Sequence, residues 1–179
     1  AGTVGRGLQL EAIKINVKSD ADIGVIYTTH VKNDGWHGNS FNGEQSGTTG
    51  QNKHVEALML KLTGKDADKY DIYYRVHAQN YGWLAWAKNG EASGYAYRLE
   101  AIQIVVTAKG DMAPTVFYGG YTSNNAKAYI SKTSTVPIIN TNASVRYQSH
   151  VSNIGWQSAV ENGSLSGTTG RNLGLEAIK

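Results

Sequence analysis

Histidine, glutamate and tryptophan recur at fixed places along this chain, and these residue types can support acid–base catalysis, metal binding or sugar binding. Each recurring tryptophan follows its histidine by six residues, in the pattern His-x-x-Asn-x-Gly-Trp. The recurring histidines are His30, His77 and His150. The recurring tryptophans are Trp36, Trp83 and Trp156. The recurring glutamates are Glu11, Glu56, Glu100 and Glu176.

Imidazole groups could serve as metal ligands or proton shuttles, because histidine titrates near neutral pH. The three recurring histidines, however, stand on separate copies of the pattern and would converge only at a symmetry axis. We therefore interpret them as structural residues that are satisfied by a neighbouring strand or by backbone groups. His37 and His54 do not recur and are expected at the surface. The sequence shows no cluster with metal-ligand spacing, so we predict neither a metal nor a cofactor.

The glutamates could be read as catalytic carboxylates. A glycosidase needs an asymmetric pair of carboxylates at a defined separation, whereas one glutamate at the same offset in every copy is a mark of symmetry. Structural hydrogen bonding is the favoured interpretation. The sequence also lacks a Ser–His–Asp order, and its Gly-Thr-Thr-Gly turns lack the lysine of a phosphate-binding loop. We therefore predict that the chain is not an enzyme.

The recurring tryptophans could stack on sugar rings, but strict repetition favours a structural wedge between neighbouring sheets, with all three tryptophans mostly buried at equivalent places. Aromatic residues that do not recur are better candidates for ligand binding, because loops can vary without loss of the fold. These candidates follow the tryptophan strand or lie in nearby turns: Trp86, Tyr81, Tyr95, Tyr97 and Phe41.

The chemistry-bearing residues belong to an internal repeat. Apolar strands with similar sequences start at Leu10, Val55, Leu99 and Leu175, and their glutamates are separated by 45, 44 and 76 residues. The sequence starts over after 165 residues, since the segment from Gly2 resembles the segment from Gly167. We interpret the chain as one superperiod of a longer repetitive array.

Each repeat reads as strands and turns. Residues 74–79 alternate with period two, a short second strand contains Trp83 and Trp86, and the third strand starts near Leu99. Strict alternation would place Leu99, Ala101 and Gln103 on one face of that third strand. Three strands per repeat of 44–47 residues predict an all-β, pseudo-threefold fold. A β-prism is preferred, with a β-trefoil as the alternative.

The string H-x-x-N-x-G-W…G…LEAI resembles the clostridial hydrophobic repeat with a tryptophan, the ChW repeat. In register with the triplets in which that repeat occurs, residues 1–17 end a first repeat, 23–64 form the second and 70–107 the third. Residues 108–143 would be a linker, with a possible hairpin around Ser123–Asn125, and 144–179 a further repeat. The third repeat lacks three residues between Gly94 and Leu99, so its turn must differ.

The resemblance implies a secreted or surface-attached protein of a Gram-positive bacterium, with a role in adhesion or in binding a glycan, a cell-wall polymer or a partner protein. Alternatives are a structural spacer that forms filaments and an ancillary module of a secreted hydrolase. The chain has no cysteine, which excludes disulfides, thiolate zinc sites and cysteine nucleophiles. The formal net charge is +3 and the basic residues are scattered, which argues against nucleic acid as a partner. No run approaches the roughly 20 apolar residues of a membrane span.

The two ends of the chain suggest self-association. The strand at Leu10–Val17 lacks the tryptophan half of its repeat, and the segment from Tyr147 contains that half. An unpaired strand edge can join another chain. We therefore expect the carboxy-terminal repeat to associate with the amino-terminal strand, either of the next copy or of the same molecule.

Overall fold

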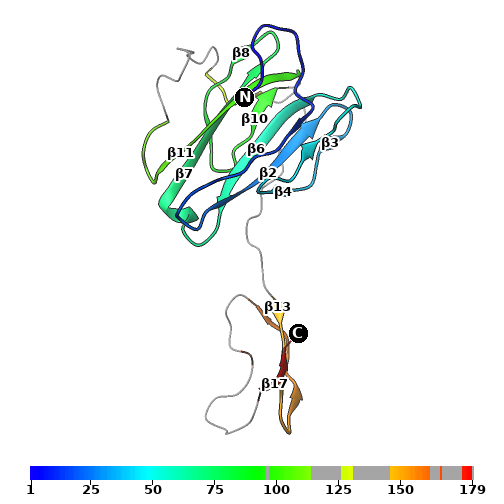
Figure 1. Cartoon of the computed structure of the whole chain (residues 1–179), viewed down its shortest axis with the longest axis vertical. Coiled ribbons are helices and arrows are strands. Elements are labelled where there is room, and N and C mark those ends of the chain that lie inside the picture. The colour runs from blue at the N-terminus through cyan, green and yellow to red at the C-terminus, as the bar shows by residue number, and fades with distance from the viewer. Residues whose placement is uncertain (96, 114–125, 131–145, 162–165, 167–174, 179) are drawn as a thin grey trace. The chain divides into compact units, whose positions relative to one another are not determined.

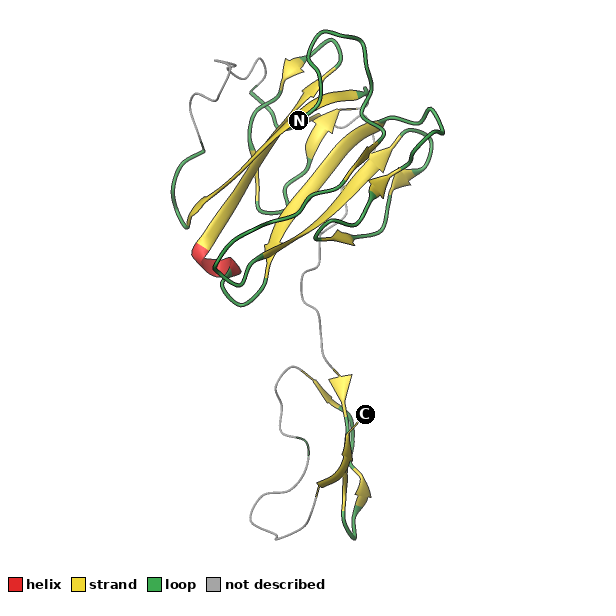
Figure 2. Cartoon of the chain, in the orientation of Figure 1, coloured by secondary structure: helices red, strands yellow, loops and turns green. Residues whose placement is uncertain are grey.

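The computed structural model describes residues 1–95, 97–113, 126–130, 146–161, 166 and 175–178. The chain divides into two compact units, Ala1–Thr141 and Asn142–Lys179. The described residues are strands and turns, and their only helical element is a single 3₁₀ turn, η1 (Ala67–Lys69) (Figure 2). The all-β expectation is confirmed.

Two pairs of long antiparallel strands form the frame of the first unit (Figure 1). In the second repeat, β2 (Gly24–Val31) pairs with β6 (Val55–Thr63). In the third repeat, β7 (Tyr70–Ala78) pairs with β11 (Leu99–Ala108). Valine, isoleucine, threonine and tyrosine are frequent in these segments, as in half-buried strands generally.

Short strands complete both repeats and link them. The second repeat contains β3 (Gly35–Trp36), β4 (Ser40–Phe41) and β5 (Ser46–Gly47). The third contains β8 (Gly82–Trp83), β9 (Ala87–Lys88) and β10 (Ser93–Tyr95). The first repeat contributes β1 (Ala12–Ile13), and β12 (Tyr129–Ile130) pairs in parallel with β10.

The second unit has the strands of one further repeat. They are β13 (Arg146–Tyr147), β14 (Ser149–Val151), β15 (Gly155–Trp156), β16 (Val160–Glu161) and β17 (Leu175–Ile178). The central strand β14 pairs with β15 on one side and β17 on the other. This order matches the β3–β2–β6 and β8–β7–β11 orders of the first unit.

Three glycine–alanine bridges join the repeats of the first unit into a ring. Gly47 of the second repeat lies opposite Ala12 of the first, and Gly94 of the third lies opposite Ala57 of the second. Gly2 of the first repeat lies opposite Ala101 of the third, which closes the ring. Each repeat thus touches the next in the same way, as pseudo-threefold symmetry requires.

Only glycine fits these three positions. All three have positive φ, with values of 94° at Gly2, 100° at Gly47 and 138° at Gly94. A Cβ atom at Gly2 would lie 2.6 Å from Ala101 Cα, and one at Gly94 would lie 2.5 Å from Ala57 Cα. The glycines therefore permit both the backbone conformation and the close approach of two repeats.

The core lies between the long strands, and two buried tyrosines connect successive repeats within it. The Tyr27 hydroxyl donates to the Glu44 carbonyl and accepts a 3.1 Å hydrogen bond from the Ile15 backbone N–H of the first repeat. The equivalent hydroxyl of Tyr74 donates to Glu91 and is hydrogen-bonded to the backbone of Leu60 in the second repeat. Burial raises the pKa of Tyr74 well above its ordinary value.

The prediction that side chains alternate strictly between the two faces of the third strand was wrong, because a β-bulge interrupts this strand. Ala78 pairs with Leu99 whereas His77 pairs with Ala101, so Glu100 is an extra residue. After the bulge the inward face continues with Ile102, which joins Leu99 in the core. A bulge of this kind turns successive side chains toward the same face.

The prediction of three strands per repeat was also wrong, because turns break the middle of each repeat into several short strands. Sheets are shared between repeats, since β10 of the third repeat pairs with β6 of the second. The choice between a β-prism and a β-trefoil stays a prediction. The expected hairpin around Ser123–Asn125 lies outside the described residues.

Candidate functional site

One arrangement of histidine, glutamate and tryptophan recurs three times in the molecule. In the second repeat, His30 Nδ1 lies 3.1 Å from a Glu56 carboxylate oxygen. The corresponding distances are 3.1 Å from His77 to Glu100 and 2.9 Å from His150 to Glu176. Each imidazole also meets an indole ring edge-on, with centroid distances of 5.4, 5.6 and 5.2 Å to Trp36, Trp83 and Trp156, respectively.

Strand register and turn geometry position these three side chains. His30 lies directly opposite Trp36 across a hairpin whose turn contains Asn33 at φ 66° and Gly35 at φ 81°. Asparagine and glycine tolerate these positive φ angles better than other residues, which explains the Asn-x-Gly spacing of the motif. The glutamate is the bulge residue on the other side of the histidine strand, as the pairing of Val31 with Val55 and of His30 with Ala57 shows.

In the first three repeats, the residue two positions before the glutamate contacts a carboxylate oxygen of that glutamate. His54 Nε2 lies 3.4 Å from Glu56 Oε1, and Arg98 Nη2 donates to Glu100 Oε1 at 3.0 Å. In the first repeat, Gln9 Nε2 donates to Glu11 Oε1 at 2.6 Å. The carboxylates thus crosslink strands. Among the residues that the structure describes, no group of three or more histidine, aspartate and glutamate side chains could hold a metal ion.

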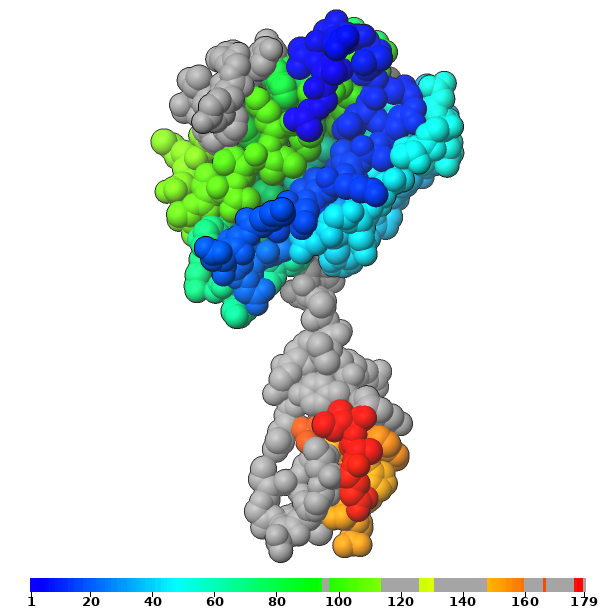
Figure 3. Space-filling view, viewed as in Figure 1, coloured from blue at the N-terminus to red at the C-terminus, as the bar shows by residue number. Residues whose placement is uncertain are grey.

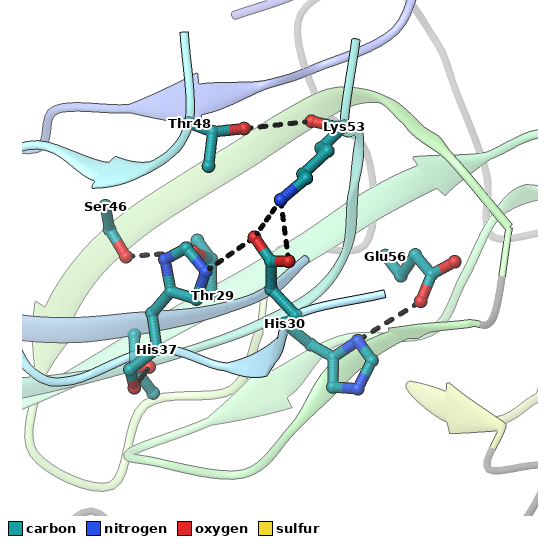
Figure 4. A network of polar contacts seen from close by, with 9 residues as sticks. Thr29, His30, His37, Ser46, Thr48, Lys53 and Glu56 are labelled. Atoms are coloured by element: carbon teal, nitrogen blue, oxygen red, sulfur yellow. Dashed lines mark hydrogen bonds and ion pairs between the residues drawn. The ribbon is translucent and has the colours of Figure 1, made fainter. Parts of the chain in front are cut away.

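The second repeat adds a polar network beside this crosslink (Figure 4). Lys53 Nζ donates to both oxygens of Asp34, at 2.8 and 3.0 Å, and His37 Nε2 lies 3.8 Å from the same carboxylate. The hydrogen bond from Lys53 holds the pKa of Asp34 below its ordinary value. His37 and His54 therefore have carboxylate neighbours, although the other repeats have no histidine at either position.

Lowering the pH below 6.5 is expected to cost stability through His54. Burial lowers the pKa of His54 from its ordinary 6.5, and the carboxylate of Glu56 only partly offsets that effect. The unfolded chain therefore takes up this proton more readily, so the stabilising contribution is complete above pH 6.5 and is lost as the pH falls from there. The variant His54→Gln places an amide donor beside Glu56, as Gln9 does beside Glu11. Below pH 6.5, its free energy of unfolding, measured by chemical denaturation, should fall less than that of the parent protein. Equal pH dependence in both proteins would contradict the assignment.

The aromatic residues outside the repeat pattern fall into separate groups. Tyr81 and Tyr97 are half-buried neighbours, with ring centroids 5.6 Å apart and planes tilted by 41°. Trp86 lies over the guanidinium of Arg75, whose Cζ is 4.8 Å from the Trp86 ring and 5.1 Å from the Trp83 ring. The structure brings the two tyrosines together. The side chain of Tyr95 lies outside the described residues.

Phe41 lies on β4 of the second repeat and is 49% exposed. No described contact joins it to the aromatic groups of the third repeat. Sequence reasoning missed Arg75, which is buried between two tryptophans and donates through Nε to Gln103 at 2.7 Å. A signal existed, because Arg75 stands where the other repeats have Thr28 and Gln148.

The family comparison explains the recurrence of this arrangement. The family model described as Clostridial hydrophobic W (ChW) matches residues 1–19, 30–64, 77–108 and 150–179. The chain belongs to the ChW repeat family. ChW repeats occur in secreted or surface proteins, and this chain is a repeat module of that kind. No curated protein and no solved structure matches the chain.

The ChW tryptophans differ in burial, which corrects the expectation that all three are mostly buried. Trp83 is 4% exposed and Trp36 is half-buried, whereas Trp156 is 45% exposed. Within the described residues, Trp83 packs in a unit of several ChW repeats, while Trp156 stands in a unit with one. A tryptophan that wedges between repeats needs a neighbouring repeat to cover it.

None of the described helical residues forms a segment long and apolar enough to cross a membrane.

Proposed function

We propose that this chain is a non-enzymatic module of a secreted or surface protein, and that it binds a glycan or cell-wall polymer through aromatic side chains of its third ChW repeat. The observation that carries the proposal is the pairing of Tyr81 with Tyr97 at 5.6 Å. Both rings are half-buried, and the other repeats have no tyrosine at either position. A surface pair of aromatic rings can present apolar faces to a pyranose ring, while each hydroxyl can bond to sugar hydroxyls.

The repeat scaffold supports this role by fixing the turns that carry the tyrosines. Tyr81 lies in the turn between β7 and β8, and its backbone N–H donates to Ala78 at 3.1 Å. Tyr97 precedes β11, where Arg98 is tied both to Glu100 and, through its carbonyl, to the N–H of Gln79. Side chains held on anchored turns lose little entropy on binding, which favours recognition of a ligand with few contacts.

The roles assigned to the recurring residues favour binding over catalysis. Glu56, Glu100 and Glu176 each contact the histidine of the same repeat, so their carboxylates form equivalent crosslinks. Linked weak sites along an array gain affinity through effective concentration. This suits attachment to a polymer that itself repeats.

A glycan array and a pull-down with peptidoglycan that carries its wall polymers test the proposal. Tyr81→Ala and Tyr97→Ala should each weaken binding of the best array ligand by about tenfold, as expected for one aromatic contact. Phe41→Ala is the matched control, since it removes an exposed aromatic ring from the second repeat. If Phe41→Ala weakens binding and neither tyrosine variant does, the binding site lies elsewhere. If the chain binds no glycan and no wall preparation, the proposal is refuted.

A further inference from the structure

A short segment that follows the third repeat adds a strand to the ring. Its strand, β12, pairs in parallel with β10, on the side of β10 that faces away from β6. The Gly94 N–H of β10 donates to the Ala128 carbonyl at 2.9 Å. The Ala85 N–H, in the loop after β8, donates to the Lys127 carbonyl at 3.2 Å. Residues 126–130 therefore bind to the edge of β10 as an added peptide strand does.

The side chains of this segment alternate between two apolar surfaces. Tyr129 packs against a small cluster of buried side chains from β2, β6 and the turn before β10. The cluster consists of Ile26, Met59 and Ala92. The residues on either side, Ala128 and Ile130, pack instead at the border of the main core. The backbone hydrogen bonds thus fix the position of the segment, and the small cluster selects an aromatic side chain at the position of Tyr129.

The ring is closed without this segment. None of the three glycine–alanine bridges that join the repeats includes residues 126–130. Residues 1–17, which contribute Gly2 to one bridge, run along the surface as a blue strip beside the green of β11 (Figure 3). Within the segment, two residues are exposed and three are half-buried. Its release should therefore cost far less free energy than unfolding of the ring.

The connection before the segment is long enough to reach beyond its own ring. Residues 114–125 precede the segment, and twelve extended residues span about 40 Å. A unit of this size has a radius of gyration of only about 15 Å. A segment tethered in this way meets its own site at an effective concentration on the order of millimolar. A neighbouring copy therefore competes for the site when the local concentration of copies approaches that value.

We propose that the edge of β10 is a strand-exchange site, at which residues 126–130 of a second copy replace the chain's own segment. The exchanged segment makes the same backbone hydrogen bonds to Ala85 and Gly94 and the same packing contacts through Tyr129. Exchange of identical segments loses no contact and requires only that two copies meet. The inference is independent of glycan binding by Tyr81 and Tyr97.

A labelled peptide tests the site itself. The probe is a synthetic peptide of residues 124–132, and its acceptor is the full chain with Tyr129→Ala, which weakens docking of the chain's own segment. The peptide should bind this variant at least tenfold more tightly than the parent chain, in which the site is occupied. A peptide with alanine in place of its tyrosine should bind the variant about tenfold more weakly. Circular dichroism checks that the variant keeps its strands. Equal affinity of the first peptide for variant and parent would overturn the assignment of the site.

Disulfide trapping tests the exchange between copies, since the chain has no cysteine. The hydrogen bond from Ala85 to Lys127 brings these two positions close enough for a disulfide when the segment is docked. The single variants Ala85→Cys and Lys127→Cys, mixed as full-length chains at about 1 mM and oxidised, should give a mixed crosslinked dimer.

The matched control for trapping replaces Lys127→Cys by Lys65→Cys, another exposed lysine that lies outside the segment. Its yield of mixed dimer should be several-fold lower. Equal yields from Lys127→Cys and Lys65→Cys would show that the segment stays on its own ring, and the proposed exchange would then be wrong.

Discussion

Replacing Trp83 by alanine is expected to lower the free energy of unfolding of the first unit by about 3–5 kcal/mol. Trp83 is 4% exposed, so the truncation removes a large buried ring and leaves a cavity. It also removes the edge contact with His77 and the ring face beside Arg75. A chemical denaturation curve, followed by circular dichroism, measures the loss.

Trp156→Ala is the matched control for this prediction, because it removes the equivalent ChW tryptophan from a repeat in which that ring is 45% exposed. Its effect on the transition of the first unit should be within the error of the measurement. If Trp83→Ala instead unfolds like the parent protein but no longer binds its glycan, the ring serves in sugar stacking and the structural assignment is wrong.

Replacing Gly94 by alanine is expected to cost about 3 kcal/mol or more. The residue has φ 138°, and a methyl group there would lie 2.4 Å from the Glu56 carbonyl oxygen and 2.5 Å from Ala57 Cα. Since both neighbours are backbone atoms, the second and third repeats must separate to admit the methyl group. The melting temperature should fall by several degrees.

Gly90→Ala separates this steric effect from backbone strain. Gly90 lies in the same repeat and also has positive φ, at 97°, but a methyl group there meets only the Lys61 side chain, at 3.7 Å. Its cost should be about 1 kcal/mol, as expected for a residue forced into a left-handed conformation. Equal losses in the two variants would mean that the repeats do not approach each other at Gly94.

The repeat pattern allowed the family and the all-β class to be predicted, and the structural role that it assigns to the histidines stays a prediction. Aligned residues such as His30 and His77 have aligned neighbours, so repetition alone indicated a shared contact. The glutamate partner of each histidine was harder to predict from the sequence. Glu56 reaches His30 because a bulge adds one residue to its strand, and period-two alternation contains no signal for a bulge.

The contacts between repeats could not be predicted from the sequence pattern either. Gly47 and Gly94 look like turn residues, yet each permits a neighbouring strand to approach. The burial of Trp156 was overestimated because equal motifs were expected to have equal surroundings, whereas burial depends on which repeats lie next to each other. The only sequence signal for Arg75 is that the equivalent residues of the other repeats, Thr28 and Gln148, are not arginine. Its position between Trp83 and Trp86 results from the pairing of β7 with β8 and β9.

Closure of the ring by the first residues is the central claim, and nuclear Overhauser contacts between backbone Hα protons test it most directly. The three glycine–alanine pairs are Gly2–Ala101, Gly47–Ala12 and Gly94–Ala57. Hydrogen bonds flank the first pair, from Thr3 N–H to Glu100 and from Ile102 N–H to Ala1, so the Hα atoms of Gly2 and Ala101 face each other, as in non-hydrogen-bonded antiparallel pairs. The ring predicts strong Hα–Hα contacts at all three pairs. Contacts at the second and third pairs without one between Gly2 and Ala101 would show an open row of repeats and contradict the closed ring.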